Sequence, residues 1–340
     1  MTTSRFDLTR SQILAFRRRV GGLDERLQPG RRSLRQAAWA GLQDSMPRAA
    51  LLSIHARVER TAPTTWEDPS LVQLWGPRFN SYVVASRDLA VFSLGRLPQE
   101  GSRRRMGEDL AARLDAFLGG RRMTDREAGQ ALGVHPNQFR YAAPTGRVVI
   151  RWDGARSPTI WTVPPPEIDP RDARLELARR YLHGFGPATP EAFAVWAGIA
   201  PRLGVEAFDA LRRSLTPART PIGDAWILTR DEPAFLAAPG PASPARLLPS
   251  GDAYFLLQGE DRELLVPEAD RRRALWTSRV WPGAVLVDGE IVGTWRRARD
   301  TMSIDTWRRL SRAERDAVEA EAATFPLPGI EGPVRVNWEG

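Results

Sequence analysis

The hydrophobic and polar residues of this chain alternate between a helical period and a strand period in a repeating order. Three joints, rich in proline and glycine or in charge, interrupt the pattern at residues 98–105, 163–171 and 237–245. We therefore divide the chain into four domains, at residues 1–100, 101–165, 166–240 and 241–340.

The second of these segments has the clearest pattern. Apolar residues at helical spacing predict a helix within 106–118, and Thr124 with Glu127 has the spacing of a capping box that begins another helix. A third short helix would cover 135–140, and two alternating runs within 148–163 predict a hairpin. Helix, helix-turn-helix and hairpin, in this order, predict a winged helix.

The first and third segments repeat this order of elements. In the third segment the pattern predicts a helix at 175–181, another that begins at Thr189, a helix at 201–215 and a strand at 225–228. In the first segment it predicts helices at 9–20, 31–43 and 47–58, and strands at 71–75, 82–85 and 91–94. Three tandem winged-helix domains therefore fit better than one large fold.

The fourth segment changes character. Short strands are predicted at 254–257, 263–266, 284–287 and 291–295, the last two joined by a hairpin turn at Asp288-Gly289, and a helix follows at 311–323. This pattern predicts a small barrel or sheet. The predicted fold class is α+β, with three tandem winged-helix domains followed by a small C-terminal β-barrel-like domain.

Composition narrows the chemistry. All 49 basic residues are arginines, cysteine is absent, and 41 acidic residues leave a net charge of +8. Schiff-base chemistry and a P-loop need lysine, and thiol or iron–sulfur chemistry needs cysteine, so these classes are excluded. Arginine has the planar fork that suits phosphate, and the charge therefore favours a polyanionic partner over an acidic small molecule.

Targeting and metal signals are missing from the sequence. No stretch has the apolar length of a membrane span or of a signal peptide, which predicts a bacterial cytoplasmic, nucleoid-associated protein. The three histidines have no metal-ligand spacing, so we expect neither a metal nor another cofactor. Nothing in the sequence indicates an obligate dimer, and we expect a monomer.

Several segments together resemble a known family. They are LTRSQILAFRRRVGGL, GLQDSMPRAALLSIHARV, RRYLHGFGPATPEAFAVWAGI, DRELLVPEADRRRALW and VLVDGEIVGTWRRAR. The chain resembles the AlkZ family of bacterial DNA glycosylases over nearly its whole length. This resemblance implies tandem winged helices around a basic concave surface, and excision of alkylated purines, including bulky genotoxin adducts and interstrand crosslinks, in some members as self-resistance.

The same resemblance implies a catalytic motif at Gln43, Asp44 and Ser45, at the end of a helix in the first domain. The family motif is glutamine, an aliphatic residue, then glutamine or aspartate, so only Gln43 matches it. A serine hydroxyl at position 45 is shorter and only weakly basic. Asp44 could replace the missing partner by stabilising an oxocarbenium-like sugar, provided that the helix ends before it.

A structural interpretation of these residues remains open. Gln43 could be a solvent-facing residue of its predicted helix, and Asp44 or Ser45 could simply cap the helix predicted from Pro47.

Two groups of arginines are the predicted phosphate contacts. Arg140 lies on the expected recognition helix, and Arg147, Arg151 and Arg156 lie on the expected wing; both elements usually meet DNA in winged helices. Arg296, Arg297 and Arg299 follow Trp295, where a DNA contact and a solvated edge beside a barrel-closing tryptophan are the alternatives.

Tyr82 and His55 complete the predicted DNA-binding set. Tyr82 stands where the resemblance implies a histidine in many relatives. His55, on the helix predicted after Gln43, either faces the same cleft or packs between helices.

Two functions are favoured by the sequence over a third, a protein-interaction scaffold whose binding would depend little on salt. The first is a monofunctional DNA glycosylase that binds double-stranded DNA containing alkylated bases and leaves an abasic site, since no lysine is present for a lyase step. The alternative is a non-catalytic winged-helix DNA-binding protein, either a regulator or an adduct-binding factor, which the departure at Ser45 supports.

Overall fold

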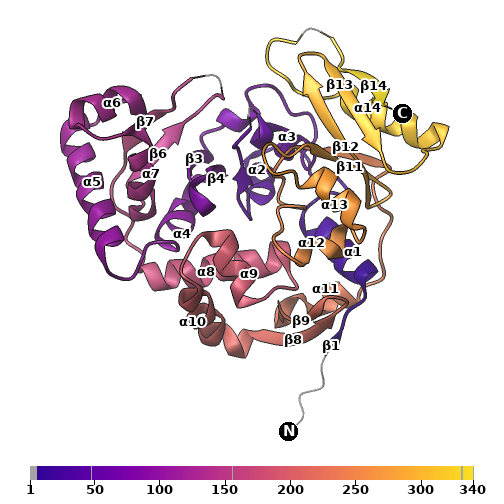
Figure 1. The fold of residues 1–340 in the computed structure, drawn as a ribbon, viewed down its shortest axis with the longest axis horizontal. Helices are drawn as coiled ribbons and strands as arrows, with labels where there is room; N and C mark the ends of the chain where they lie inside the picture. Colours follow the sequence, from indigo (N-terminus) through magenta and orange to yellow (C-terminus); the bar gives the residue numbers. More distant parts are fainter. Residues whose placement is uncertain (1–5, 47, 155, 331, 340) are drawn as a thin grey trace.

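The computed structural model describes residues 6–46, 48–154, 156–330 and 332–339. Helices and sheets are mixed along the chain, so the predicted α+β class is confirmed. Figure 1 shows four groups of elements, which we call the first, second and third units and the C-terminal sheet. The second unit lies at the left, the third at the bottom and the C-terminal sheet at the upper right.

The first unit begins with a short strand and a capped helix. Its elements are β1 (Phe6–Asp7), α1 (Arg10–Val20), α2 (Arg31–Ala37), β2 (Leu42–Gln43), α3 (Ala49–His55), β3 (Leu71–Trp75), β4 (Ser81–Ala85) and α4 (Leu89–Leu94). Thr9 caps α1 through a capping box with Gln12.

The second unit follows the order that the sequence predicts. It contains α5 (Ser102–Leu118), β5 (Met123–Thr124), α6 (Asp125–Leu132), α7 (Phe139–Ala142), β6 (Val148–Arg151) and β7 (Thr159–Thr162). The capping box of Thr124 and Glu127 at the start of α6 is confirmed, and so is the β6–β7 hairpin.

The third unit repeats that order. It contains α8 (Pro170–Phe185), α9 (Pro190–Ala197), α10 (Pro201–Leu211), β8 (Leu215–Thr220), β9 (Gly223–Leu228) and α11 (Glu232–Leu236). Thr189 caps α9 and Pro190 occupies its first position, as predicted.

The C-terminal part is built on one sheet. Its elements are β10 (Ala245–Leu248), α12 (Asp261–Leu265), α13 (Ala269–Leu275), β11 (Gly283–Val287), β12 (Glu290–Ala298), β13 (Thr301–Thr306), α14 (Arg312–Ala323) and β14 (Arg335–Glu339). The strands pair in the order β10-β11-β12-β13-β14, so the described strands form an open sheet and not a closed barrel.

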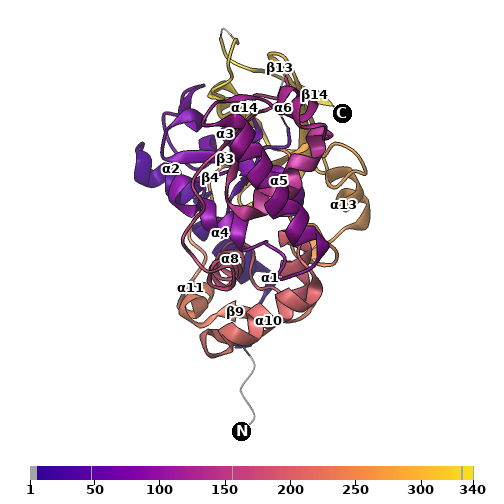
Figure 2. The same ribbon diagram turned by 90° about the vertical axis from the view of Figure 1, so that its left-hand side faces the viewer.

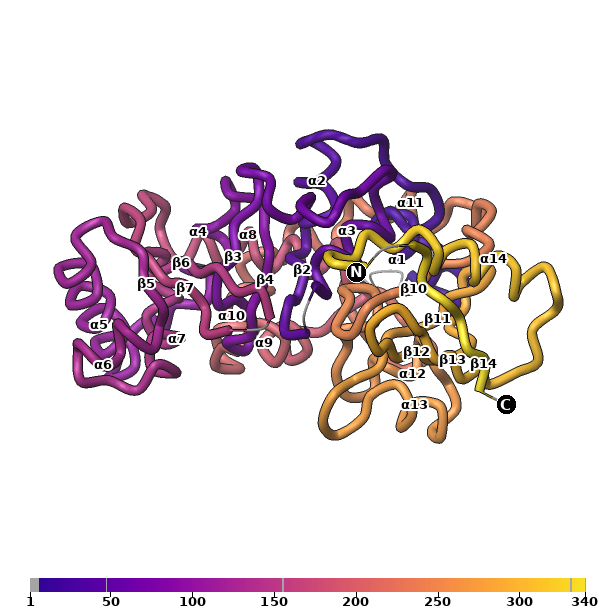
Figure 3. Tube along the Cα trace, turned by 90° about the horizontal axis from the view of Figure 1, so that it is seen from above, coloured from indigo at the N-terminus to yellow at the C-terminus, as the bar shows by residue number. Residues whose placement is uncertain are grey.

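Strand pairing joins the units to one another. A six-stranded sheet runs β2-β4-β3-β6-β7-β5, and Figure 3 shows it extending from β5 at the left to β2 near the centre. The first and second units meet in it where Gln73 of β3 pairs with Ile150 of β6. The N-terminal β1 pairs in parallel with β8 of the third unit, which places α1 against α11 and α12.

The largest cluster of buried apolar side chains is shared between units. It joins the first unit, the third unit and the C-terminal part, including one side of strands β10 and β11. A second cluster fills the other side of the C-terminal sheet, and a third fills the second unit. Figure 2 shows the consequence from the side of α5: α10 and β9 form the lower end, and β13 and β14 lie at the upper end.

Several predicted elements are wrong. Residues 91–94 and 263–265 lie in helices α4 and α12, and the buried residues 254–257 form a turn followed by irregular backbone. Short apolar runs without alternation fit a buried helix or turn as well as a strand, so their length and composition misled the prediction. The helix predicted at 31–43 ends at Ala37, which leaves Gln43 in a strand; Pro47, predicted to begin the next helix, lies outside the described residues.

Candidate active site

The amide of Gln43 is held at both ends. Gln43 lies on β2, opposite Tyr82 of β4, and only 8% of it is exposed. Its Nε2 donates to Ser45 Oγ at 2.7 Å. Its Oε1 accepts from Arg78 Nη2 at 3.1 Å and, more weakly, from the Tyr82 hydroxyl at 3.4 Å. These contacts fix the orientation of the amide, as a water-positioning group requires.

Arg78 reaches Gln43 from a strained turn between β3 and β4. Arg78 and Phe79 have φ values of 53° and 59°, in the left-handed region that costs a residue with a side chain about 1–2 kcal/mol. Arg96 supports the turn, because its guanidinium lies over the Phe79 ring and donates to the Trp75 carbonyl. Burial lowers the pKa of Arg96 to about 10. Strain held in this way is typical of functional sites.

A loop from the C-terminal part closes on the other side of Gln43. Gly251 has a φ of +76°, and a Cβ atom there would lie 2.8 Å from Gln43 Nε2. The next residue, Asp252, anchors the loop, because its carboxylate accepts two hydrogen bonds from Arg57 at 2.7 and 2.8 Å and one from Ser53. Arg57 holds the pKa of the Asp252 carboxyl below its usual range despite complete burial. The ion pair therefore fixes the backbone that faces Gln43.

Asp44 points away from Gln43. Successive side chains of an extended segment face opposite sides, and the Asp44 carboxylate accepts from the Ala50 amide at 2.9 Å and from Gln73 Nε2 at 2.7 Å. It shares no hydrogen-bonding partner with Gln43. Burial raises the pKa of Asp44 to about 6. The predicted helix end does precede Asp44, but the structure does not bring its carboxylate to the Gln43 amide.

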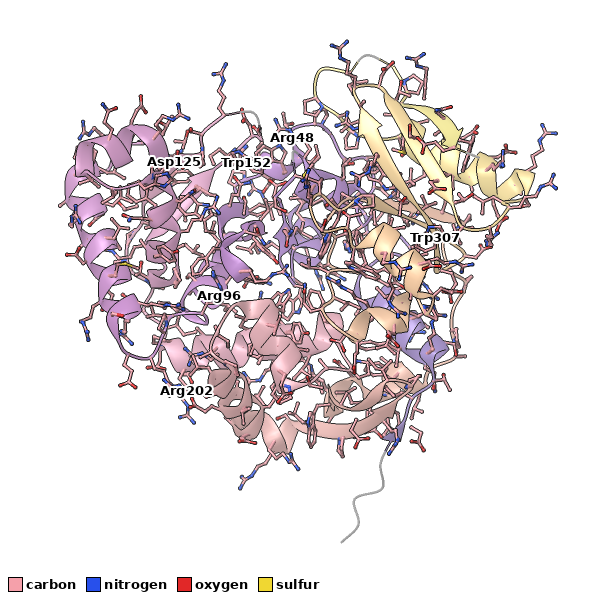
Figure 4. All side chains as sticks on the ribbon, viewed as in Figure 1. Arg48, Arg96, Asp125, Trp152, Arg202 and Trp307 are labelled. Atoms are coloured by element: carbon pink, nitrogen blue, oxygen red, sulfur yellow. The ribbon has the colours of Figure 1, made fainter. Side chains whose placement is uncertain are left out.

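Gln73 connects Asp44 to the second unit. While its Nε2 donates to Asp44, its Oε1 accepts from the backbone amide of Trp152 at 2.6 Å. Figure 4 labels Trp152 at the upper edge of the structure, next to the β6–β7 hairpin. Gln73 also pairs with Ile150, where the β3–β4 hairpin meets the β6–β7 hairpin. By holding the Gln73 side chain, Asp44 stabilises this junction of the first and second units.

Ser45 is the residue of the predicted motif that meets Gln43. Its hydroxyl accepts from Gln43 Nε2, and the residue is half-buried, as is the following Met46. The structure therefore pairs Gln43 with Ser45, and not with Asp44.

Tyr82 and His55 are interior residues. Tyr82 is fully buried, and burial raises the pKa of its hydroxyl to about 12. His55 is 5% exposed, and its ring nitrogens contact Thr61 and Thr324 at 2.7 and 3.0 Å. Burial lowers the pKa of His55 to about 3, so its ring is neutral. Burial argues against direct DNA contact by either ring, although Tyr82 contacts Gln43 directly.

The predicted phosphate contacts of the second unit divide into two pairs. Arg140 on α7 and Arg156 between β6 and β7 are exposed. Arg147 forms an ion pair with Asp115, whereas Arg151 pairs with Glu67 at 3.0 Å and lies over the Trp66 ring. Arg140 and Arg156 are therefore better placed for phosphate than the other two.

The C-terminal arginines lie where β12 turns into β13. Arg296 and Arg299 are exposed and Arg297 is half-buried, and burial lowers the pKa of Arg297. Trp295 is 6% exposed and donates from Nε1 to the Leu248 carbonyl at 2.9 Å. Trp295 therefore packs inside the domain, while Arg296 and Arg299 lie on its exposed edge.

Sequence reasoning missed Arg78 and Gly251. The Gly76-Pro77 pair before Arg78 indicates a turn, but nothing in the sequence shows that this turn reaches β2. Gly251 comes from a segment 208 positions away from Gln43, and only the tertiary fold brings them together.

The described residues contain neither a candidate metal site nor a candidate membrane span. Among them, no group of three histidine, aspartate or glutamate side chains is arranged to hold a metal ion. No helix of the described chain has the length and apolarity needed to cross a membrane.

A family model, a curated relative and a solved structure all relate this chain to DNA glycosylases. The family model described as DNA glycosylase AlkZ-like matches residues 37–326. A Streptomyces sahachiroi protein named "Interstrand DNA cross-link repair glycosylase" is 32% identical over 163 residues, which is 46% of this chain and 42% of that protein. The solved structure of Streptomyces sahachiroi DNA glycosylase AlkZ superposes with a TM-score of 0.79 at 20% identity, covering 98% of this chain and 100% of that one.

Proposed function

Because this chain belongs to the DNA glycosylase AlkZ-like family, we propose that it is a monofunctional DNA glycosylase that acts on alkylated purines in duplex DNA. The observation that carries the proposal is the Gln43 amide, which hydrogen bonds hold at both ends beside the Gly251 loop. Preorganised polar groups of this kind can position a water without reorganisation during the reaction. The interstrand crosslink named for the Streptomyces protein is one candidate substrate.

The reaction needs little base catalysis. Alkylation at N7 or N3 makes the purine cationic, so the C1′–N9 bond can break with its electron pair leaving on the base. A water held between the second Nε2 proton of Gln43 and Ser45 Oγ then forms the new bond to C1′, and its proton passes to solvent. Ser45 needs only to accept a hydrogen bond in this step.

Arg78 keeps the Gln43 amide in one orientation. Its guanidinium donates to Oε1, which leaves Nε2 directed at Ser45. We assign Arg78 and Tyr82 as positioning residues, since both act through Gln43. Asp44 is assigned to the junction of the first and second units.

DNA is a polyanion, and its phosphates would contact arginines of more than one unit. We propose that Arg140, Arg156, Arg296 and Arg299 contact phosphates, because all four are exposed. The three repeated helix–hairpin units are proposed to be winged helices, and the protein is proposed to act on a bacterial genome as a monomer. The second unit presents Arg140 and Arg156, and the C-terminal sheet presents Arg296 and Arg299.

The test is release of 7-methylguanine from duplex DNA. We expect Gln43→Ala to slow release by about 100-fold, within the range for loss of a group that positions or activates water, and we expect Asp44→Asn to retain most activity. Gln130→Ala, on the exposed face of α6, is the matched control and should behave as wild type. Equal release by Gln43→Ala and wild type would refute the assignment.

One observation favours the non-catalytic alternative. Both acceptor positions of Gln43 Oε1 are used, by Arg78 and Tyr82, and one Nε2 proton is used by Ser45. A protein that only binds damaged DNA would release no base from any adduct while retaining salt-dependent duplex binding.

A further inference from the structure

A recess of about 320 Å³ lies between the first unit and the C-terminal sheet. We call it the tryptophan recess, and its lining includes Met46, Leu52, Trp281, Trp295, Arg296 and Arg297. Its walls come from three distant segments, namely the residues after β2, the loop after β10, and strands β11 and β12. Such a recess exists only in the folded chain, and no segment of the described chain fills it.

The lining of the tryptophan recess contains the sequence neighbours of two residues that meet the Gln43 amide. Met46, in its wall, is the next residue after Ser45, which accepts the hydrogen bond from Gln43. Ser250, in the opposite wall, is the next residue before Gly251, whose backbone faces Gln43 Nε2. A group bonded to a base at the Gln43 site would therefore enter the recess by extending past Ser45 or Gly251.

The lining combines apolar walls with a cationic rim. Trp281 is half-buried, Leu52 is buried, and Val280 in the lining is 46% exposed. Arg296 and Arg297 donate to the backbone carbonyls of Val280 and Arg299, and among the described residues neither forms an ion pair. Two guanidinium groups without acidic partners complement the phosphates of a polyanion.

Together these features select one class of occupant. Indole rings and aliphatic side chains bind planar apolar groups by stacking and by excluding water. The arginine rim places such a group next to a phosphate backbone. A free hydrophobic metabolite would gain nothing from the rim, and an unmodified base would already be stacked in the duplex.

We propose that the tryptophan recess binds a planar aromatic substituent carried by the damaged purine, while Gln43 faces the sugar of the same nucleotide. This proposal rests on the proposed glycosylase function and deepens it, because it assigns selection among alkylated purines to the recess. The substituent lies against Trp281 and Met46, and Arg296 contacts the flanking phosphate.

The test compares two duplexes that differ by one phenyl ring. One contains 7-methylguanine and the other 7-benzylguanine, both on a 2′-fluorinated deoxyribose that slows spontaneous base loss. Dissociation constants are measured by fluorescence anisotropy at fixed salt. We expect wild type to bind the benzyl duplex at least tenfold more tightly than the methyl duplex, because only the benzyl group reaches the recess.

Two variants fill the tryptophan recess from opposite walls. Val280→Trp and Met46→Trp are expected to reduce the benzyl preference to twofold or less. Val205→Trp, at a similarly exposed valine of α10 (42% exposed) in the third unit, is the matched control and should keep the full preference. Because one variant can fail to fold, the prediction requires the effect only from those variants whose melting temperature matches wild type.

The outcomes separate this proposal from the proposed function. No benzyl preference in wild type, or a preference that survives in folded recess variants, overturns the proposal. Release of both bases from the corresponding unfluorinated duplexes is measured in parallel. Preference without release would refute the glycosylase and leave the recess as a lesion-binding site, whereas release without preference would refute the recess alone.

Discussion

Replacing Asp44 with asparagine should remove a pH dependence that this carboxyl imposes on stability. The pKa of Asp44 rises from an ordinary value of 3.8 to about 6 in the folded protein because the group is buried. The folded state therefore holds this proton more tightly than the unfolded state does. As pH rises through the interval from 3.8 to 6, the free energy of unfolding falls by about 3 kcal/mol and then levels off.

Hydrogen bonding at Asp44 gives the substitution a second effect on stability. The two Asp44 oxygens accept from the Ala50 amide and from Gln73, so the NH2 group of an asparagine would face one of these donors, unless Gln73 turned over and left the Trp152 amide unpaired. An unsatisfied buried polar group costs about 1–3 kcal/mol. At pH 7 the lost pairing and the removal of a buried charge oppose each other, whereas at pH 4 Asp44 is itself protonated and no buried charge destabilises the wild type.

The assay is urea unfolding of wild type and Asp44→Asn at pH 4, 5, 6 and 7. The difference between their unfolding free energies should change by about 2 kcal/mol from pH 4 to pH 7, because part of the interval lies below pH 4. Asp209→Asn, at an exposed position of α10, is the matched control and should follow wild type throughout. A difference that stays constant across this range would refute the reasoning, since the carboxyl would then titrate alike in both states.

Three further predictions concern the Gln43 loop, its anchor and the DNA contacts. Gly251→Ala should slow base release at least tenfold with DNA binding retained, because the new Cβ would lie 2.8 Å from the amide nitrogen it faces, and single-turnover release measures this. Arg57→Ala should lower the unfolding free energy by about 3–5 kcal/mol in urea titrations, since it leaves the Asp252 carboxylate buried and unpaired. Arg140→Gln should reduce the slope of log affinity against log salt by about 1, whereas Arg147→Gln, already paired with Asp115, should reduce it less; equal slopes would contradict the assignment.

Local signals in the sequence predicted local structure well. The capping box at Thr124 and the Thr189-Pro190 start of α9 depend only on neighbouring residues, and both are confirmed. Long amphipathic helices such as α5 were found for the same reason. Residues 254–257 were predicted as a strand because the run is short and uniformly apolar, but burial among helices of other units decides its conformation.

The candidate site was only partly predictable. The family resemblance located Gln43, but the choice between Asp44 and Ser45 depended on whether the segment was helical or extended. On a strand the two neighbours face opposite sides, so the hydrogen bond from Gln43 goes to Ser45 two positions away. Arg78 and Gly251 reach the site through a strained turn and a distant loop, which no periodicity encodes.

The parallel pairing of β1 with β8 also governs how the nascent chain can fold. Phe6 pairs with Ala218, so β1 cannot form its pairing until some 200 further residues have been synthesised. At ordinary synthesis rates this takes about 10–40 s. During that time the apolar side of α1, with Ile13 and Phe16, has none of its partners Ile227, Phe235 and Leu264 to cover it. Translation must therefore be nearly complete before the N-terminal helix can dock, and an N-terminal fragment that stops near residue 100 should be a client of chaperones and not a stable domain.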